Sequence, residues 1–187
     1  ACLALVGGTL TALILGLTDI RWKGAFTFLL LIPMMIPPHV TAIAWIQAMG
    51  PSSPLLKTLG IAPEIGTTNP LYSRAGVVFL LGVQPAPLVF LVLLAALRSM
   101  PREMSDAARV AGARPWRLLT RIILPLLLPA LLAGFALAFV SALGNFGIPA
   151  LLGIPGRYTT LPVLIWQRLA SFGPSVLTDV AVIAALV

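Results

Sequence analysis

Long apolar stretches alternate with short polar connections along this chain. The apolar stretches cover residues 1–18, 24–50, 75–97, 122–145 and 172–187. A helix needs about 20 apolar residues to cross a bilayer, so the three middle stretches are long enough and the two terminal ones are shorter. All five lack the alternation of polar and apolar residues that strands of a transmembrane barrel show. The pattern therefore predicts an all-α, polytopic bundle of transmembrane helices.

The composition supports a membrane protein rather than a soluble one. Hydrophobic residues make up 59% of the chain and charged residues 9%, and the mean hydropathy is +1.06. Soluble domains carry roughly 25% charged residues. No long linker divides the chain, so we expect one transmembrane domain over residues 1–187. Because the chain begins with Ala and stops inside an apolar stretch, we expect a fragment of a longer protein, truncated at both ends.

Cationic side chains concentrate in alternate connections, which predicts the orientation of the helices. Six of the twelve Lys and Arg residues are Arg98, Arg102, Arg109, Arg114, Arg117 and Arg121. Short cytoplasmic connections of membrane proteins carry the excess of Lys and Arg. We therefore place residues 19–23 and 98–121 in the cytoplasm, and residues 51–74 and about 146–172 outside. The formal net charge of +7 then reflects topology, and nucleic-acid binding is not expected.

Few residues are available for catalysis or metal binding. The chain has one His, one Cys and five acidic residues, and these form neither a paired-carboxylate site nor the ligand set of a usual metal centre. It also lacks the G-x-x-x-x-G-K-[ST] phosphate loop of ATPases. We therefore expect no catalytic residue, no metal site and no cofactor in this chain, and any energy must come from another subunit.

The arginine-rich connection, residues 100–121, has the pattern of two short helices. Pro101 and Pro115 suit first helical turns, and Gly112 suits the end of the first helix. One face of that helix would carry Met104, Ala107, Ala108 and Ala111. Such a shallow, mainly alanine face allows another surface to come close. Two interpretations remain open: an interfacial segment whose arginines only fix topology, and a docking element for a cytoplasmic partner.

Seven positions in and after this connection match a motif. The pattern E-A-A, three residues, G, nine residues, I-x-L-P is matched by Asp106, Ala107, Ala108, Gly112, Ile122, Leu124 and Pro125. The one departure is Asp for Glu at the first position, which keeps the negative charge. From its second apolar stretch onward, the chain thus resembles the membrane subunits of ATP-binding-cassette importers, the MetI-like permeases.

The resemblance implies a transport subunit rather than an enzyme. Its fold would be the MetI-like helical bundle with cytoplasmic coupling helices, and residues 100–121 would fit a groove on a separate ATP-binding-cassette ATPase dimer, which binds ATP and Mg²⁺. Ala107, Ala108 and Gly112 would supply the close-approach face and the turn, and Asp106 and the arginines would make polar contacts to the ATPase. Further expected partners are a periplasmic solute-binding protein and a second permease domain, in the same chain or a dimer. The protein would cross the bilayer of the bacterial inner membrane several times.

The cargo is predicted from the outer region of the chain. Residues 144–174 resemble the corresponding region of ferric-iron importer permeases, so ferric iron is the expected cargo. Permeases for thiamine, polyamines, sulfate or phosphonates share parts of this region, so these cargoes remain alternatives. An ATP-independent channel or scaffold is a more remote alternative, because only the number of apolar stretches and the polar residues inside them favour it.

Polar residues inside apolar stretches are candidates for a translocation path, because an unpaired polar group in hydrocarbon is costly. These candidates are His39, Thr41, Gln84, Ser141 and Asn145. For each, the alternative is a hydrogen bond to a neighbouring helix or to a backbone carbonyl.

Prolines and outer residues complete the set of candidates. Prolines in or beside the stretches are Pro33, Pro37, Pro38, Pro85, Pro87, Pro125 and Pro129. Each removes a backbone donor, so we expect bent helices, either because membrane helices tolerate proline or because the bends serve a path that opens on alternate sides. Outer residues Arg157, Arg168 and Trp166 are candidates for contact with the binding protein, or for solvated and interfacial positions.

Overall fold

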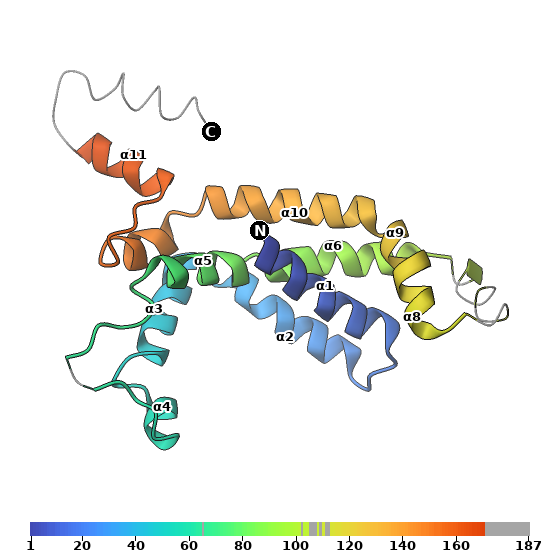
Figure 1. Ribbon diagram of the computed structural model, residues 1–187, viewed down its shortest axis with the longest axis horizontal. Helices are drawn as coiled ribbons and strands as arrows, with labels where there is room; N and C mark the ends of the chain where they lie inside the picture. The colour runs from blue at the N-terminus through green and yellow to red at the C-terminus, as the bar shows by residue number, and fades with distance from the viewer. Residues whose placement is uncertain (65, 102, 105–107, 109, 111–112, 171–187) are drawn as a thin grey trace. The chain divides into compact units, whose positions relative to one another are not determined.

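The computed structural model describes residues 1–64, 66–101, 103–104, 108, 110 and 113–170, and every element that these residues form is a helix (Figure 1). The α-helices are α1 (Cys2–Leu17), α2 (Lys23–Met35), α3 (Pro38–Ala48), α4 (Pro54–Thr58), α5 (Arg74–Val83), α6 (Ala86–Ser99), α8 (Pro115–Leu118), α9 (Leu124–Leu126), α10 (Leu128–Leu143) and α11 (Leu161–Ala170). Two short π-helical turns are η1 (Leu119–Ile123) and η2 (Pro149–Gly153). The predicted all-α fold is therefore confirmed for the described part of the chain.

The chain divides into two compact units. Unit 1 comprises Ala1–Met35 and Gly82–Val140, and unit 2 comprises Ile36–Leu81 together with the chain from Ser141 onward. The main hydrophobic core of unit 1 is formed by α1 and α6. The core of unit 2 is formed by α3, α5 and the segment around η2. Each unit thus buries apolar side chains in a core of its own.

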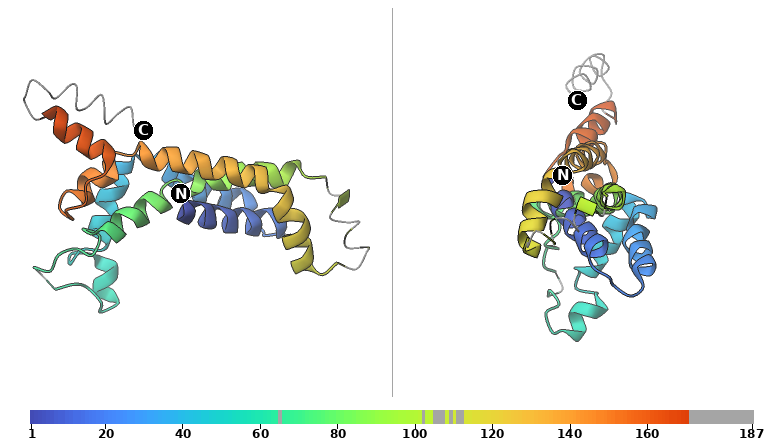
Figure 2. Two further views of the ribbon diagram at one scale, coloured as in Figure 1. Left: turned by 45° about the horizontal axis from the view of Figure 1, so that its top comes forward. Right: turned by 90° about the vertical axis from the view of Figure 1, so that its right-hand side faces the viewer.

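A seam of small residues joins α1 to α6, which lie side by side in unit 1 (Figure 2). The members of this small-residue seam on α1 are Ala4, Gly8, Ala12 and Gly16. A spacing of four places them on one face of the helix. A Cβ atom on Gly8 would lie 2.7 Å from the Cβ of Val89 and 2.8 Å from the carbonyl oxygen of Ala86. The two backbones can therefore approach closely, which is how helices associate in lipid without a hydrophobic driving force.

Unit 1 also contains a helical segment that is bent. The part formed by α8, η1 and α9 makes an angle of 63° with α10. Pro125 and Pro129 have no amide hydrogen, so the series of helical backbone hydrogen bonds is incomplete on both sides of Leu127. The bend is supported by packing, because Leu127 is buried in one cluster with Leu118 and Ile123.

The predicted helix start at Pro115 is confirmed, with Arg114 as its N-cap residue. The helix passes through Ile122, where the sequence predicts entry into the bilayer, and reaches Leu126 before the bend. Most of the first predicted helix, residues 101–112, lies outside the described residues; of the described ones, 103–104, 108 and 110 are helical and Pro101 is not.

Unit 2 is built from shorter elements joined by polar turns. Its core contains Ala42, Leu71, Val77, Leu80, Ile148 and Leu152. The side-chain amide of Asn69 donates to the carbonyl oxygen of Ile46 on α3 at 2.9 Å, and its carbonyl oxygen accepts from the amide of Leu71 at 3.0 Å. Asn69 therefore ties the connection before α5 to α3. Trp45 of α3 also packs edge-on against Phe79 of α5, with 5.6 Å between the ring centroids.

The predicted spans are represented by single helices and by broken pairs. Among the described residues, the helical segment Arg74–Ser99, which comprises α5 and α6, is long and apolar enough to cross a membrane. Two further pairs of helices are each interrupted by a sharp bend, and if each pair is counted as one span, there are up to three spans. The predicted 24–50 stretch is one of these pairs, α2 and α3, interrupted at Ile36 and Pro37. Successive prolines at 37 and 38 explain the interruption, because the residue before a proline is disfavoured in helical conformation.

Candidate functional site

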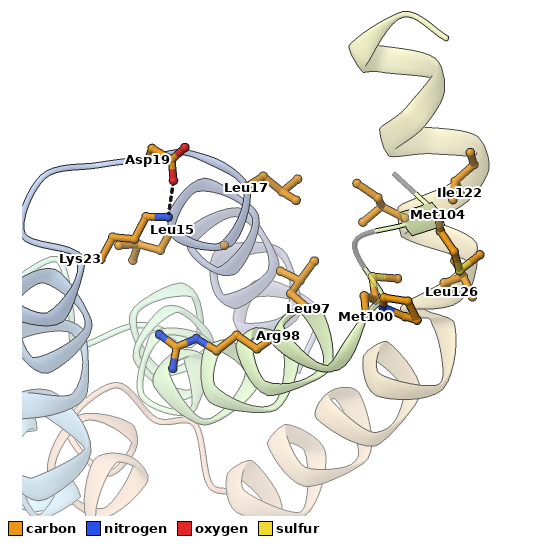
Figure 3. Close-up of a pocket in the computed structure, with 13 residues that line it drawn as sticks. Leu15, Leu17, Asp19, Lys23, Leu97, Arg98, Met100, Met104, Ile122 and Leu126 are labelled. Atoms are coloured by element: carbon orange, nitrogen blue, oxygen red, sulfur yellow. Dashed lines mark hydrogen bonds and ion pairs between the residues drawn. The ribbon is translucent and has the colours of Figure 1, made fainter. Parts of the chain in front are cut away.

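Unit 1 contains a cavity of about 460 Å³ at the end that the sequence places in the cytoplasm (Figure 3). We call it the juxtamembrane cavity. Its walls come from the end of α1, the connection between α1 and α2, the end of α6 with the residues after it, and the turns of η1 and α9. The charged residues at its wall are Asp19, Lys23 and Arg98. The two predicted cytoplasmic connections therefore border one cavity.

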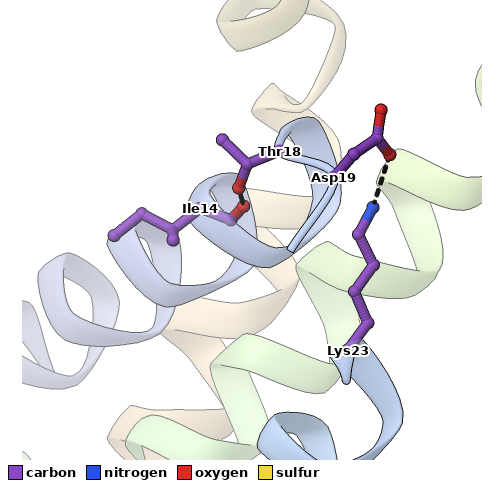
Figure 4. Close-up of polar contacts among 4 residues, drawn as sticks. All are labelled: Ile14, Thr18, Asp19 and Lys23. Carbon is purple, nitrogen blue, oxygen red and sulfur yellow. Dashed lines mark hydrogen bonds and ion pairs between the residues drawn. The ribbon is translucent and has the colours of Figure 1, made fainter. Parts of the chain in front are cut away.

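An ion pair lies in the connection between α1 and α2 (Figure 4). The ammonium nitrogen of Lys23 lies 3.2 Å from a carboxylate oxygen of Asp19, four residues earlier. The hydroxyl of Thr18 donates to the carbonyl oxygen of Ile14 at the last turn of α1. The carboxylate is fully exposed, so the ion pair adds little to stability. Its effect is on charge, because Asp19 partly neutralises one of the two cations at the cavity.

One motif residue at the far end of the predicted coupling pattern, Ile122, lines this cavity. The motif residues Leu124 and Pro125 follow it in α9. The amide of Leu124 donates to the carbonyl oxygen of Leu119, five residues back, which defines the wider π-turn η1. The motif thus places a proline two residues after the end of a π-turn, in a region where the regular helix is interrupted twice within ten residues.

The motif residues of the first short helix are only partly described. Ala108 packs against the buried cluster of Leu118, Ile123 and Leu127, and its carbonyl oxygen accepts from the amide of Ala113 at 2.9 Å. Asp106, Ala107 and Gly112 lie outside the described residues. At Ala108, therefore, the alanine face contacts the chain's own bent segment.

Unit 2 contains a second cavity, of about 450 Å³, which brings together two of the predicted path residues. His39 at the start of α3 and Asn145 both line it. Asn145 is buried, and its side-chain oxygen accepts from the amide of Ile148 at 3.2 Å. A Cβ atom on Gly147 would lie 2.9 Å from the backbone nitrogen of His39. Glycine at this position therefore lets the chain pass close to the first turn of α3.

The other path candidates do not join this cavity. The hydroxyl of Thr41 donates to the carbonyl oxygen of Pro37. A hydrogen bond to a backbone carbonyl was the alternative to a place in the translocation path. Ser141 is exposed near the end of α10. Gln84 belongs to unit 1, in the short break between α5 and α6. Among the described residues, no group of three His, Cys, Asp or Glu side chains could hold a metal ion.

The outer candidates occupy mixed environments. Trp166 on α11 is about half exposed and packs against Phe146, with 5.9 Å between the ring centroids. Arg157 is exposed and has a positive φ of 53°. The guanidinium of Arg74 lies 5.6 Å from the centre of the Tyr158 ring. An aromatic and cationic surface therefore surrounds the turn after η2 in unit 2.

The sequence did not reveal which residues shape the contact between α1 and α6, the juxtamembrane cavity and the cavity of unit 2. Gly8 and Gly147 are required for close backbone approaches, and the sequence signal at Gly8 was the repeat of small residues at every fourth position. Lys23 was interpreted as a topology signal, and Arg98 as a topology signal and one of the arginines that would contact the ATPase. Their shared position at one cavity depends on how the chain folds, which no local pattern reveals.

Comparison with known proteins assigns the chain to a family. Residues 8–187 match the family described as "Binding-protein-dependent transport system inner membrane component". The chain belongs to this family. The family match supports a membrane component of a transport system, and it extends across both units.

Three relatives in this family illustrate the similarity. A probable sulfate transport system permease protein of Nephroselmis olivacea is 34% identical over 62% of this chain and 42% of its own length. A putative 2-aminoethylphosphonate transport system permease protein of Salmonella typhimurium is 33% identical over 71% of this chain and 47% of its own length. A molybdenum transport system permease protein of Escherichia coli is 31% identical over 81% of this chain and 66% of its own length. The chain thus spans about half the length of these relatives.

Proposed function

We propose that this chain is part of the membrane-spanning permease subunit of an ATP-driven importer. Its cargo would arrive on a periplasmic binding protein and pass through a path that a second permease domain completes. A separate ATPase dimer, which binds ATP and Mg²⁺, would supply the energy. The observation that carries the proposal is the family match over residues 8–187, together with the seven motif positions at fixed spacing.

The coupling segment of the proposal is residues 100–121. It contains α8 and most of η1, and Ala108 packs against the buried cluster of Leu118, Ile123 and Leu127. Side chains packed at protein density transmit displacement rather than absorb it. A push on the segment by the ATPase would therefore reach the bend at Leu127, where the two flanking prolines leave the helix fewer hydrogen bonds to break.

The path part of the proposal rests on the cavity of unit 2. His39 and Asn145 are the two predicted path residues that line it. An imidazole and a carboxamide can each donate hydrogen bonds to a polar cargo. A path needs such weak, replaceable contacts rather than a tight cage, because the cargo must also leave.

For the cargo, we propose an oxyanion such as sulfate or a phosphonate. The support is that relatives from three different organisms are named for sulfate, 2-aminoethylphosphonate and molybdenum transport. Ferric iron, the cargo expected from residues 144–174, is the competing candidate. A hydrogen-bonding cavity without an acidic side chain suits an oxyanion better than a trivalent cation, which favours carboxylate and other anionic oxygen ligands.

The test uses the full-length protein with its ATPase in lipid vesicles. ATP hydrolysis would be measured while the binding protein is added empty, or loaded with sulfate, a phosphonate, molybdate or ferric iron. We expect stimulation of hydrolysis by one oxyanion-loaded form. Stimulation by the iron-loaded form alone would overturn the cargo and keep the importer, and no ATPase association would overturn the importer.

The coupling part is tested separately by Gly112→Glu. A bulky acidic side chain at the predicted turn should abolish cargo-stimulated hydrolysis while the protein still inserts. Gly24→Glu is the matched control, because a Cβ there meets nothing within 4 Å and an acidic residue in the first turn of α2 is favourable. Unchanged coupling in Gly112→Glu would contradict the assigned segment.

A further inference from the structure

Within the juxtamembrane cavity, two cationic side chains come from different segments of unit 1. Lys23 lies at the start of α2 and Arg98 in the last turn of α6. Figure 3 shows both cationic ends on the side of the cavity where α1 ends. Lys23 pairs with Asp19, whereas within the described part of the chain Arg98 forms no ion pair. The described wall of the cavity therefore carries one excess positive charge, on a guanidinium group.

Among the other residues that line the cavity, Leu15, Leu97, Leu126 and Ile122 present apolar side chains. Leu126 is 46% exposed, so part of this apolar surface is open. A small hydrated anion would contact only the polar part of the cavity, whereas an amphiphile would also bury acyl carbons against these side chains.

The position of the cavity fits the same kind of ligand. It lies at the ends of apolar helices, on the side where the positive-inside pattern places the cytoplasm. The cytoplasmic leaflet holds the anionic lipids that basic pockets between membrane helices bind by their headgroups. A volume of about 460 Å³ is in the range of small-ligand pockets and suits a glycerophosphate headgroup.

We propose that the juxtamembrane cavity binds the phosphate headgroup of an anionic phospholipid. Arg98 donates hydrogen bonds to the phosphate oxygens, because a guanidinium matches phosphate geometry with two donors. Lys23 adds a second positive charge once its pairing with Asp19 loosens. The upper part of the acyl chains contacts Leu97 and Leu126.

Bound lipid would contact the motif region. Ile122 lines the cavity two residues before Leu124, the next motif residue. A headgroup held by Arg98 therefore joins the end of α6 to the segment that precedes the bend. Lipid binding itself does not depend on the proposed importer function, so the two can fail independently.

The test measures lipid retention by the full-length protein. Protein purified in mild detergent is titrated with phosphatidylglycerol, and bound lipids are counted by native mass spectrometry. We expect retention of phosphatidylglycerol in preference to phosphatidylethanolamine. Arg98→Gln should weaken phosphatidylglycerol binding about tenfold, the effect of losing one charge-assisted contact. Asp19→Asn should strengthen it, because Lys23 is then released from its partner.

The matched control is Arg21→Gln, which removes a cation of the connection between α1 and α2 that does not line the cavity. Equal losses in Arg98→Gln and Arg21→Gln would overturn the site in favour of general surface charge. Competition by inorganic phosphate as strong as by lipid would overturn the lipid as ligand. Arg98→Lys keeps the charge, and partial recovery of binding in that variant excludes misfolding as the cause of the loss.

Discussion

Units 1 and 2 are held together by different kinds of contact. In unit 1, α1 and α6 meet through the small-residue seam, and their buried residues are apolar. In unit 2, side-chain oxygens of Ser53, Asn69 and Asn145 accept hydrogen bonds from backbone amides at turns. Among the described residues, the buried polar side chains are Ser53 and Asn145, and both belong to unit 2.

The length of the helices explains this difference. A long helix satisfies its own backbone groups, so a neighbouring helix needs only a complementary shape. A short helix leaves a larger share of its amides and carbonyls unpaired, and polar side chains must satisfy them. Unit 1 should therefore respond most strongly to changes of side-chain size, and unit 2 to the loss of single polar groups.

The largest effect is expected in the small-residue seam. Gly8→Ala would place a methyl group 2.8 Å from the Ala86 carbonyl oxygen, a backbone atom that cannot move without shifting α6. Overpacking of this kind costs roughly 3 kcal/mol of unfolding free energy. Thermal unfolding of the full-length protein in detergent should show a lower midpoint temperature.

Gly7→Ala is the control for Gly8→Ala. The added Cβ would lie 3.9 Å from the Cβ of Ala86, an ordinary contact. Because alanine is about 1 kcal/mol better than glycine in a helix interior, this neighbouring variant should be unchanged or more stable. Similar losses at both positions would refute the one-sided seam.

An intermediate effect is expected at Asn69 in unit 2. Asn69→Ala removes both hydrogen bonds, to the Ile46 carbonyl and from the Leu71 amide, and should cost about 2 kcal/mol because a half-buried amide and carbonyl lose their partner. Asn69→Asp keeps the acceptor for Leu71 and loses the donor, so it should retain part of the stability. The same unfolding measurement checks both variants, and an equal loss in the two would mean that the acceptor contributes nothing.

The smallest effect is expected at the cationic and aromatic surface of unit 2. Arg74→Met keeps an unbranched, though shorter, side chain and removes the charge that lies 5.6 Å from the Tyr158 ring centre. A cation–π contact near the surface contributes about 0.5 kcal/mol. Tyr158→Phe keeps the ring and should be nearly neutral. If Arg74→Met destabilised more than Asn69→Ala, the hydrogen bonds at turns would not be the contacts on which unit 2 depends most.

The sequence predicted the class, the helices and several of their ends. The apolar stretches correctly indicated an all-α membrane component, and Pro115 was correctly placed at a helix start. These features are local, because the length of an apolar stretch and the φ angle of proline do not depend on the rest of the chain. The motif is also local, because its seven positions lie close together in the chain, and it indicated the family to which the chain belongs.

The sequence did not predict which distant residues meet. His39 and Asn145 share a cavity, whereas Gln84 belongs to the other unit, although all three had the same signal of a polar residue in an apolar stretch. The contact of Ala108 with Leu118 and its cluster was likewise not predicted, whereas its expected contact with a partner stays a prediction. Such pairings depend on how helices break and pack, and a break of one or two residues changes them.

The π-turn at η1 has a consequence for insertions and deletions. A π-turn contains one residue more than the α-helical turn that it replaces, and each residue of an α-helix turns the chain by about 100°. Deletion of one residue between Leu119 and Ile123 would allow a regular helix to form here. Every side chain upstream, Arg117 and Trp116 included, would then point in a direction about 100° away from its present one. The extra residue therefore fixes the rotational phase of the arginine-rich segment relative to α9.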